Sequence, residues 1–547
     1  MKDLPDPQAP LRRPHDVMRL ARMGVMMPTR LSFLRALVRR LCGERAEITR
    51  TLWHMDADGI GHSVHRVTLS GHVYSLVSVT RPLDPADRSD RVIATAWDAA
   101  FVLFDGTPTD DDLARISANA PLQEAGRFSP RDLVLSRANK SVRLWEETVR
   151  ALRVGRQPDA AMIRDIGYLM RTTAVYGNGK FGIADRHLIS DRPGLEGAFA
   201  AEMLTVLMIR QFTLDLVEHV GQGRLDRRLA RHLGIGNATG LGMAPFLVHH
   251  PVLLNNWMVA RETALARVRA VPTLDAADRD RLQALVARAA AHLDEWHVPM
   301  EEHEATLRQL AADWPQIQSA VTQLPEDHPL DALWQQGQTM RVPVQELLAA
   351  TLIEMCPDLV DGLTDCMADP FGPLVGAFAD TDHLRRSIAS HWAWALDIDY
   401  DARPDCERFW YVSAAKLEPR IGNRFAEEGA ALETPLDVAR RVARAYADLP
   451  KTPCAVSAFV ARYPQHALAV QRAAILDRYP YAEIRDNLIA ATCRPIDMLR
   501  CKLSFFGATK FDPKSDLWTR ITLAQGAPLG DEMRPEMDDW WLPVLAA

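Results

Sequence analysis

Three short motifs occur twice in this chain, in the same order and at similar spacing. A Trp-x-x-Asp-x-Asp pattern begins at Trp53 and again at Trp394, and an aromatic, strand-like run follows each copy, VYSLVS and then FWYVSA. An aromatic residue and the pattern Gly-x-x-Lys-Phe close both stretches, with the lysines at Lys180 and Lys510. One match could arise by chance, but three in one order indicate an internal duplication.

The duplicated unit is predicted to be a small α+β unit, with copies at residues 46–190 and 391–520, because 547 residues exceed one hydrophobic core. Residues 191–390 show helical periodicity and no run that alternates with period two, so we expect an all-helical domain between the copies. Residues 1–45 form a proline-rich tail with basic amphipathic helices, and residues 521–547 form a C-terminal tail. The expected fold class is α+β, predominantly helical.

The first copy contains local signals for both strands and helices. Residues 63–80 alternate on either side of Ser70-Gly71 and predict a β-hairpin, and residues 91–106 predict a third strand. Helical patterns are expected to follow, over residues 132–155 and over residues 160–176.

The glycine-rich stretch YGNGKFG, residues 176–182, has two interpretations. A phosphate-binding loop follows a strand and begins a helix, whereas this stretch follows an expected helix, so its first glycine is predicted to cap the helix end. The alternative is that Asn178 and Lys180 bind an anion together with Arg171, which lies about two turns earlier on the same expected helix. Lys510 occupies the corresponding place in the second copy.

Acidic residues and one histidine are the candidates for proton transfer. Asp56 and Asp58 have the spacing of turn-forming aspartates, and metal binding or general-base catalysis is the alternative. Asp215 and His219 are four residues apart on an expected helix, so the aspartate could orient the histidine as a general base. The other interpretation of this pair is a solvated helix edge.

Two further stretches are candidate binding loops. In KLEPRIGNR, residues 416–424, Lys416 and Arg420 alternate after an aromatic strand, which indicates a solvated sheet edge or an anion-binding lip. GIGNATGLG, residues 234–242, lacks the third glycine of a dinucleotide fingerprint and follows a helix, so a helix–helix connection or a substrate-binding loop is expected. No cluster of histidines, cysteines and acids has metal-ligand spacing, and no metal site is predicted.

Charge and cysteine content restrict the setting. The formal net charge of -7 supplies no overall attraction to nucleic acid, so no nucleic-acid partner is expected. Seven scattered cysteines fit a reduced cytoplasm, and no apolar run approaches the roughly 20 residues that span a bilayer. The basic amphipathic stretch at residues 28–41 is expected to be a docked first helix, with peripheral contact to a membrane or partner as the alternative.

These features favour a soluble cytoplasmic enzyme of bacterial type that acts on a small anionic metabolite, phosphorylated or carboxylated. The site is expected between the duplicated units and the helical domain, while cofactor and metal requirement are not predicted. The alternative is a non-enzymatic interaction or regulatory protein that uses the duplicated units, and exposed aromatics such as Trp540 and Trp541, as binding surfaces. The catalytic candidates are Asp56, Asp58, Asp215 and His219, and the substrate-binding candidates are Arg171, Asn178, Lys180, Lys416, Arg420 and Lys510.

Overall fold

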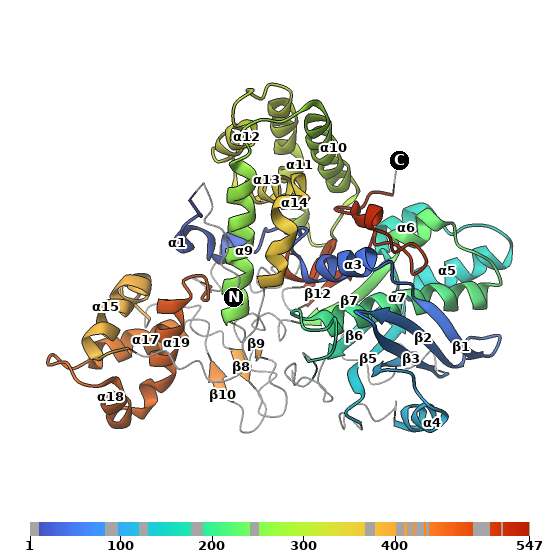
Figure 1. Cartoon of the computed structure of the whole chain (residues 1–547), viewed down its shortest axis with the longest axis horizontal. Coiled ribbons are helices and arrows are strands. Elements are labelled where there is room, and N and C mark those ends of the chain that lie inside the picture. The colour runs from blue at the N-terminus through green and yellow to red at the C-terminus, as the bar shows by residue number, and fades with distance from the viewer. Residues whose placement is uncertain are drawn as a thin grey trace.

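A computed structural model shows a mixed α/β protein that is largely helical. In Figure 1 a large sheet lies on the right, a group of long helices at the top, and a smaller group of helices on the left. The residues that the structure describes are 10–82, 97–119, 129–176, 189, 191–240, 251–366, 378–400, 410–412, 419–421, 431–433, 437–484, 504–515 and 518–545.

The large sheet has nine strands in the order β1-β2-β3-β4-β5-β6-β7-β12-β11. All neighbours are antiparallel except β6 and β7, which run parallel. A small second sheet has the order β10-β8-β9. The strands are β1 (Thr49–Met55), β2 (Gly61–Leu69), β3 (His72–Thr80), β4 (Ala99–Asp105), β5 (Asp132–Lys140), β6 (Tyr168–Tyr176), β7 (Gly234–Gly240), β8 (Trp410–Val412), β9 (Pro419–Ile421), β10 (Ala431–Glu433), β11 (Lys510–Ser515) and β12 (Trp518–Leu523).

The helices are distributed along the whole chain, before, between and after the strands. Those that belong to the first half of the chain are α1 (Pro14–Val17), α2 (Leu20–Met23), α3 (Phe33–Gly43), α4 (Asp110–Asn119), α5 (Val142–Arg153), α6 (Ala160–Ile166), α7 (Ala200–Gly221), α8 (Arg227–His232) and α9 (Pro251–Arg269). The second half contributes α10 (Ala276–Glu295), α11 (Glu301–Val321), α12 (Pro329–Gly337), α13 (Val342–Met355), α14 (Pro357–Val360), α15 (Thr381–His391), α16 (Ala393–Leu396), α17 (Asp437–Asp448), α18 (Val456–Arg462) and α19 (Ala467–Arg478). Three short 3₁₀ segments are η5 (Asp361–Cys366), η8 (Pro464–His466) and η9 (Pro535–Asp538).

Helix α7 defines the two faces of the sheet. Most of its side chains are buried because it contacts the sheet as well as α3 and α5, and its partly exposed residues form one narrow polar stripe, Gln211, Asp215, Glu218 and His219. We call the face that α7 covers the inner face; its apolar residues include Phe101 and Leu103 of β4. The opposite, outer face carries Val77, Val102 and Leu135, with which Ile116 of α4 forms a separate small core.

The predicted hairpin and third strand of the first copy are confirmed. Strands β2 and β3 pair from end to end, and Ser70 and Gly71 both adopt positive φ at the two-residue turn between them. Strand β4 lies within the stretch predicted to be the third strand.

The two predicted helices after β4 are wrong in part. The first, over residues 132–155, begins as strand β5 and becomes helical only at α5. The second ends at Ile166, where Gly167 adopts φ 77 and caps α6, and the rest of the stretch is strand β6. The sequence of β6 is rich in threonine, valine and tyrosine, which favour a strand once β5 and β7 are available as partners.

The prediction of an all-helical segment at residues 191–390 is also wrong, because this segment contributes strand β7 to the sheet. The glycines of β7 suit close packing between β6 and β12. A Cβ atom at Gly234 would lie 2.3 Å from the carbonyl oxygen of Leu523, and one at Gly236 would lie 2.7 Å from the ring of Tyr168. A strand built from glycine has no hydrophobic alternation, so periodicity could not reveal it.

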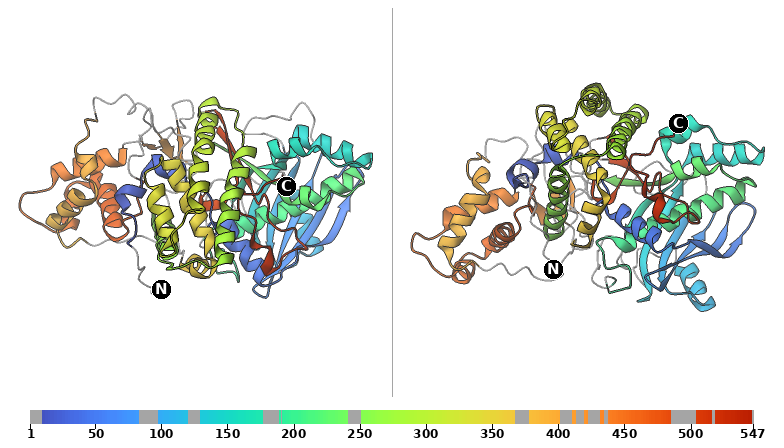
Figure 2. Two further views of the ribbon diagram at one scale, coloured as in Figure 1. Left: turned by 90° about the horizontal axis from the view of Figure 1, so that it is seen from above. Right: turned by 45° about the horizontal axis from the view of Figure 1, so that its top comes forward.

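The predicted second copy is distributed over two parts of the structure. Trp394 lies on α16 and packs against a core formed by α15–α19, which lie apart from the sheet in all views of Figures 1 and 2. Lys510 begins β11 at the edge of the large sheet. Trp53, which corresponds to Trp394 in the repeated motif, lies on strand β1 of that sheet rather than on a helix. The duplication itself remains a prediction from the sequence.

Candidate functional site

The catalytic candidates Asp215 and His219 lie on α7 where it crosses the β1–β2 hairpin. Asp215 does not contact His219; its Oδ2 atom lies 3.1 Å from Nε2 of His65, on β2. Its Oδ1 atom accepts a hydrogen bond of 2.9 Å from the side-chain amide of Gln211, and a guanidinium nitrogen of Arg50 lies 3.8 Å from its Oδ2 atom. Asp215 therefore orients a histidine, but a different histidine from the predicted one.

His219 is occupied on both sides of its ring. Its Nε2 donates to the carbonyl oxygen of Asp56 at 2.7 Å, and its Nδ1 accepts from the indole nitrogen of Trp53 at 3.4 Å. A neutral imidazole with this tautomer has no lone pair left for a substrate. The structure thus uses His219 to hold the hairpin turn against α7.

The carboxylate of Asp56 shapes the hairpin turn. Its Oδ1 atom accepts hydrogen bonds from the backbone N–H groups of Asp58 at 2.9 Å and Ile60 at 2.8 Å. This is the turn chemistry expected of aspartate. Asp58 is exposed at the tip of the turn. Within the part of the chain that the structure describes, no group of three or more histidine, cysteine or acidic side chains could hold a metal ion.

His65, on the inner face, is a candidate functional residue that the sequence alone does not indicate. Its side chain is 0% exposed and meets the rings of Trp53 and Phe212 edge-on. Its Nδ1 atom is buried and has no hydrogen-bond partner. The His65–Asp215 pair has the orientation of a general base, but its imidazole does not reach solvent, so the pair packs the sheet onto α7 in this conformation.

The binding candidate Arg171 lies on the outer face, on the other side of the sheet from Asp215 and His219. It pairs with Asn139 of β5, and Arg137 of β5 pairs with Ala174 of β6. Because β5 alternates, Arg137 and Asn139 point to the same face as Leu135, which belongs to the outer core. All three polar residues are buried, at 5%, 6% and 6% exposure for Arg137, Asn139 and Arg171.

Trp97 and Asp98, which directly precede β4, contact Arg137 and its neighbours on β5. The Arg137 guanidinium lies 3.6 Å from the ring centroid of Trp97. Asp98 donates its backbone N–H to Oδ1 of Asn139 at 3.0 Å, and its own Oδ2 accepts from the backbone N–H of Lys140 at 2.9 Å. We call Trp97, Arg137, Asn139 and Arg171 the outer-face arginine cluster.

Lys510 lies in the same cross-strand row as Arg171, but three strands away. The row runs from Arg171 through Gly236 and Thr522 to Lys510, which corresponds to roughly 14 Å between the outer members. The Lys510 ammonium group donates to the carbonyl oxygen of Arg164 in the last turn of α6. Burial lowers the pKa of this amine, and the residue caps a helix end rather than joining the arginine cluster.

The remaining binding candidates are placed only in part. Asn178, Lys180 and Lys416 lie outside the described residues. Arg420 lies on β9, where it pairs with Tyr411 of β8. These candidates remain predictions.

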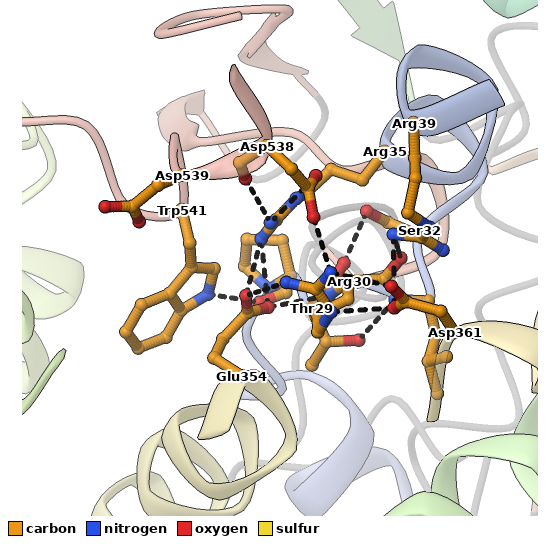
Figure 3. Close-up of polar contacts among 12 residues, drawn as sticks. Thr29, Arg30, Ser32, Arg35, Arg39, Glu354, Asp361, Asp538, Asp539 and Trp541 are labelled. Atoms are coloured by element: carbon orange, nitrogen blue, oxygen red, sulfur yellow. Dashed lines mark hydrogen bonds and ion pairs between the residues drawn. The ribbon is translucent and has the colours of Figure 1, made fainter. Parts of the chain in front are cut away.

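A second polar cluster, which joins the two ends of the chain to the helical segment, is shown in Figure 3. Arg30 contacts both carboxylate oxygens of Asp361, at 2.7 and 2.8 Å, and also Asp538. Arg35 contacts both oxygens of Glu354 at 2.9 Å. Glu354 is 2% exposed, so this is a buried ion network.

The same cluster explains the position of the basic N-terminal stretch. Helix α3 buries its apolar face, and the indole nitrogen of Trp541 donates to the carbonyl oxygen of Pro28 at 2.8 Å. The predicted first helix is therefore docked in this structure. Trp540 and Trp541 are 5% and 2% exposed, so the expectation that they form an exposed surface is wrong.

Among the described helices, none combines the length and hydropathy that a bilayer crossing requires. Comparisons with known protein families, with curated proteins and with solved structures find no match for this chain.

Proposed function

We propose that this protein is an enzyme that acts on a small anionic metabolite, phosphorylated or carboxylated, bound at the outer-face arginine cluster. The observation that supports the proposal is the pair Arg137 and Arg171, two buried guanidinium groups on neighbouring strands of one sheet face. Sequence reasoning had selected only Arg171. The second arginine beside it strengthens the case for an anion.

Charge and geometry both favour an anionic ligand here. Side chains at diagonal positions on neighbouring strands are separated by about 7–8 Å, which allows two arginines to converge on one phosphate or carboxylate. A guanidinium group presents several N–H donors in a planar fork that matches the oxygens of a carboxylate or phosphate, so both side chains are suited to an anion. Asn139 adds an amide at the same place, and the face of Trp97 fixes one guanidinium.

The proposal separates binding from the inner-face residues. Asp215 and His219 belong to α7 on the inner face, with the sheet between them and Arg171, so they do not act on a ligand held at the outer face. The general acid or base for such a ligand must come from another residue. This makes ligand binding the first property to test and turnover the second.

Binding is tested by thermal shift with inorganic phosphate, pyrophosphate, sugar phosphates, nucleotides and di- and tricarboxylates. We expect one class of anion to raise the melting midpoint of the wild-type protein. At a hundredfold excess over Kd, the bound ligand increases the free energy of unfolding by about 2.7 kcal/mol. Arg171→Gln and Arg137→Gln should abolish the shift, and Arg171→Lys should weaken it because lysine lacks the planar fork. Arg156→Gln, at an exposed arginine, is the matched control.

Equal shifts in wild type and Arg171→Gln, with both proteins folded by circular dichroism, would place the ligand elsewhere. Turnover is tested by incubating the stabilising compound with the protein and following product formation by mass spectrometry. Conversion that depends on Arg171 supports an enzyme. Binding without conversion supports the alternative, a non-enzymatic regulatory protein.

A further inference from the structure

Two histidines face each other across the β1–β2 hairpin, at the free edge of the large sheet. His54 of β1 pairs with His62 of β2, and Nδ1 of His54 lies 3.2 Å from Nε2 of His62. The two rings are nearly perpendicular, at 87°. His54 is exposed and His62 is half-buried, so solutes can reach the pair.

The separation of these two nitrogens matches that of two ligands on one transition-metal ion. Zinc–nitrogen bonds of about 2.0–2.1 Å in tetrahedral geometry place two ligand nitrogens about 3.3 Å apart. In the metal-free pair one imidazole donates a hydrogen bond to the other. On metal binding, the donor ring moves that proton to its other nitrogen, and both facing nitrogens present lone pairs to the metal.

The hairpin holds the pair in place before any ion arrives. The turn between the two histidines is closed by the Asp56 carboxylate and tied to α7 through His219. Thr80 of β3 adds a hydrogen bond to the Gly59 carbonyl at 2.7 Å and accepts one from the Gly61 N–H at 2.9 Å. A rigid scaffold reduces the entropy lost when the ligands are fixed on a metal.

We propose that His54 and His62 bind a divalent transition-metal ion such as Zn²⁺. Imidazole ligands select zinc, copper or nickel over magnesium and calcium, which prefer oxygen. Two protein ligands leave the other coordination positions to water or to a ligand in solution, so the affinity is modest and the bound ion is open to a third partner. The two ligands are eight residues apart in the chain and are brought together only by the hairpin pairing, so their sequence spacing does not indicate a metal site.

The test is a zinc titration of the purified full-length protein against a chromophoric chelator. We expect the wild-type protein to take up one equivalent that His54→Ala and His62→Ala each lose or bind at least about tenfold more weakly. His383→Ala is the matched control, because it removes a histidine from a different part of the chain, where His383 and His391 each lie 3.8 Å from Asp477.

The fold of each variant is checked by circular dichroism; both positions should tolerate alanine, since His54 is exposed and His62 is only half-buried. The proposal is overturned if both hairpin variants keep the wild-type stoichiometry and affinity, or if only His383→Ala loses the ion. The result of the zinc titration does not affect the anion-binding proposal, because Arg137 and Arg171 take no part in the histidine site.

Discussion

At the residue scale, the candidate site was predictable only where a single element determines it. The spacing of Asp215 and His219 indicated one face of one helix, and both do lie where α7 meets the sheet. Their partners His65 and Trp53 come from strands about 150 residues away in the chain. No local pattern reveals which strand a helix will cover, so His65 could not be found from the sequence.

Arg137 shows a second reason why the sequence does not predict the whole candidate site. Its stretch was assigned to a helix, and on a helix it would not have shared a face with Arg171. Only the pairing of β5 with β6 brings the two arginines together on the outer face. Recognition of the anion-binding pair therefore required the correct secondary structure at both positions.

His292 leads to a prediction about pH. It lies on α10 with 2% exposure and donates from Nδ1 to the carbonyl oxygen of Pro543 at 3.0 Å. Burial lowers its pKa from 6.5 to about 4. A group with a lowered pKa in the folded state contributes stability above its unfolded pKa and loses it as pH falls.

We therefore expect the free energy of unfolding to decrease between pH 6.5 and pH 4, with His292 responsible for roughly 3 kcal/mol of that loss. His292→Gln keeps a donor and should flatten this part of the profile, as measured by urea denaturation at several pH values. His297→Gln, at an exposed histidine, is the control. A variant profile as steep as that of wild type would contradict the prediction.

At the element scale, turn chemistry was predictable and strand insertion was not. Ser70-Gly71 specifies the β2–β3 hairpin from two residues, because both positions need positive φ. Strand β6 was mistaken for a helix, and β7 for a connection, because both exist through partners far away in the chain. Local propensity and periodicity carry no information about such partners.

Gly234 provides a test of the β7 assignment. Gly234→Ala should lower the free energy of unfolding by about 1–3 kcal/mol, because the new Cβ meets the Leu523 backbone at 2.3 Å and a backbone atom moves less readily than a side chain. Gly43→Ala is the matched control, since no atom lies within 4 Å of its Cβ position. Equal stability of the two variants in urea denaturation would argue against a buried β7 between β6 and β12.

At the scale of the whole molecule, buried ion networks join segments from the two ends of the chain to the central helices. The cluster in Figure 3 links Arg30 and Arg35 to Glu354 on α13 and to Asp538 of η9. A second network places the fully buried Glu346 of α13 within 2.8 Å of Arg12, Arg22 and Arg261. The N-terminal segment is thus part of the folded core.

Removal of one member of the Figure 3 cluster should be strongly destabilising. Glu354→Ala leaves Arg35 buried at 2% exposure without its carboxylate, and we expect a loss of about 3–5 kcal/mol. The matched control is Asp382→Ala on α15, whose ion pair with Arg386 is exposed and should be worth less than about 1 kcal/mol. Calorimetric midpoints compare the two; a loss in Glu354→Ala no larger than in the control would show that the network does not stabilise the fold.

The order of strands in the large sheet also affects how the protein is synthesised. Strand β7 is internal only because β12 pairs with it, and roughly 280 residues separate these strands, which a ribosome adds in about 14–56 seconds. During that interval the nascent β7 presents unpaired backbone groups along a sheet edge, which is the structure that recruits strands from other chains. The helices α9–α19 are made in the same interval, so most of the molecule emerges from the ribosome before its sheet can be completed.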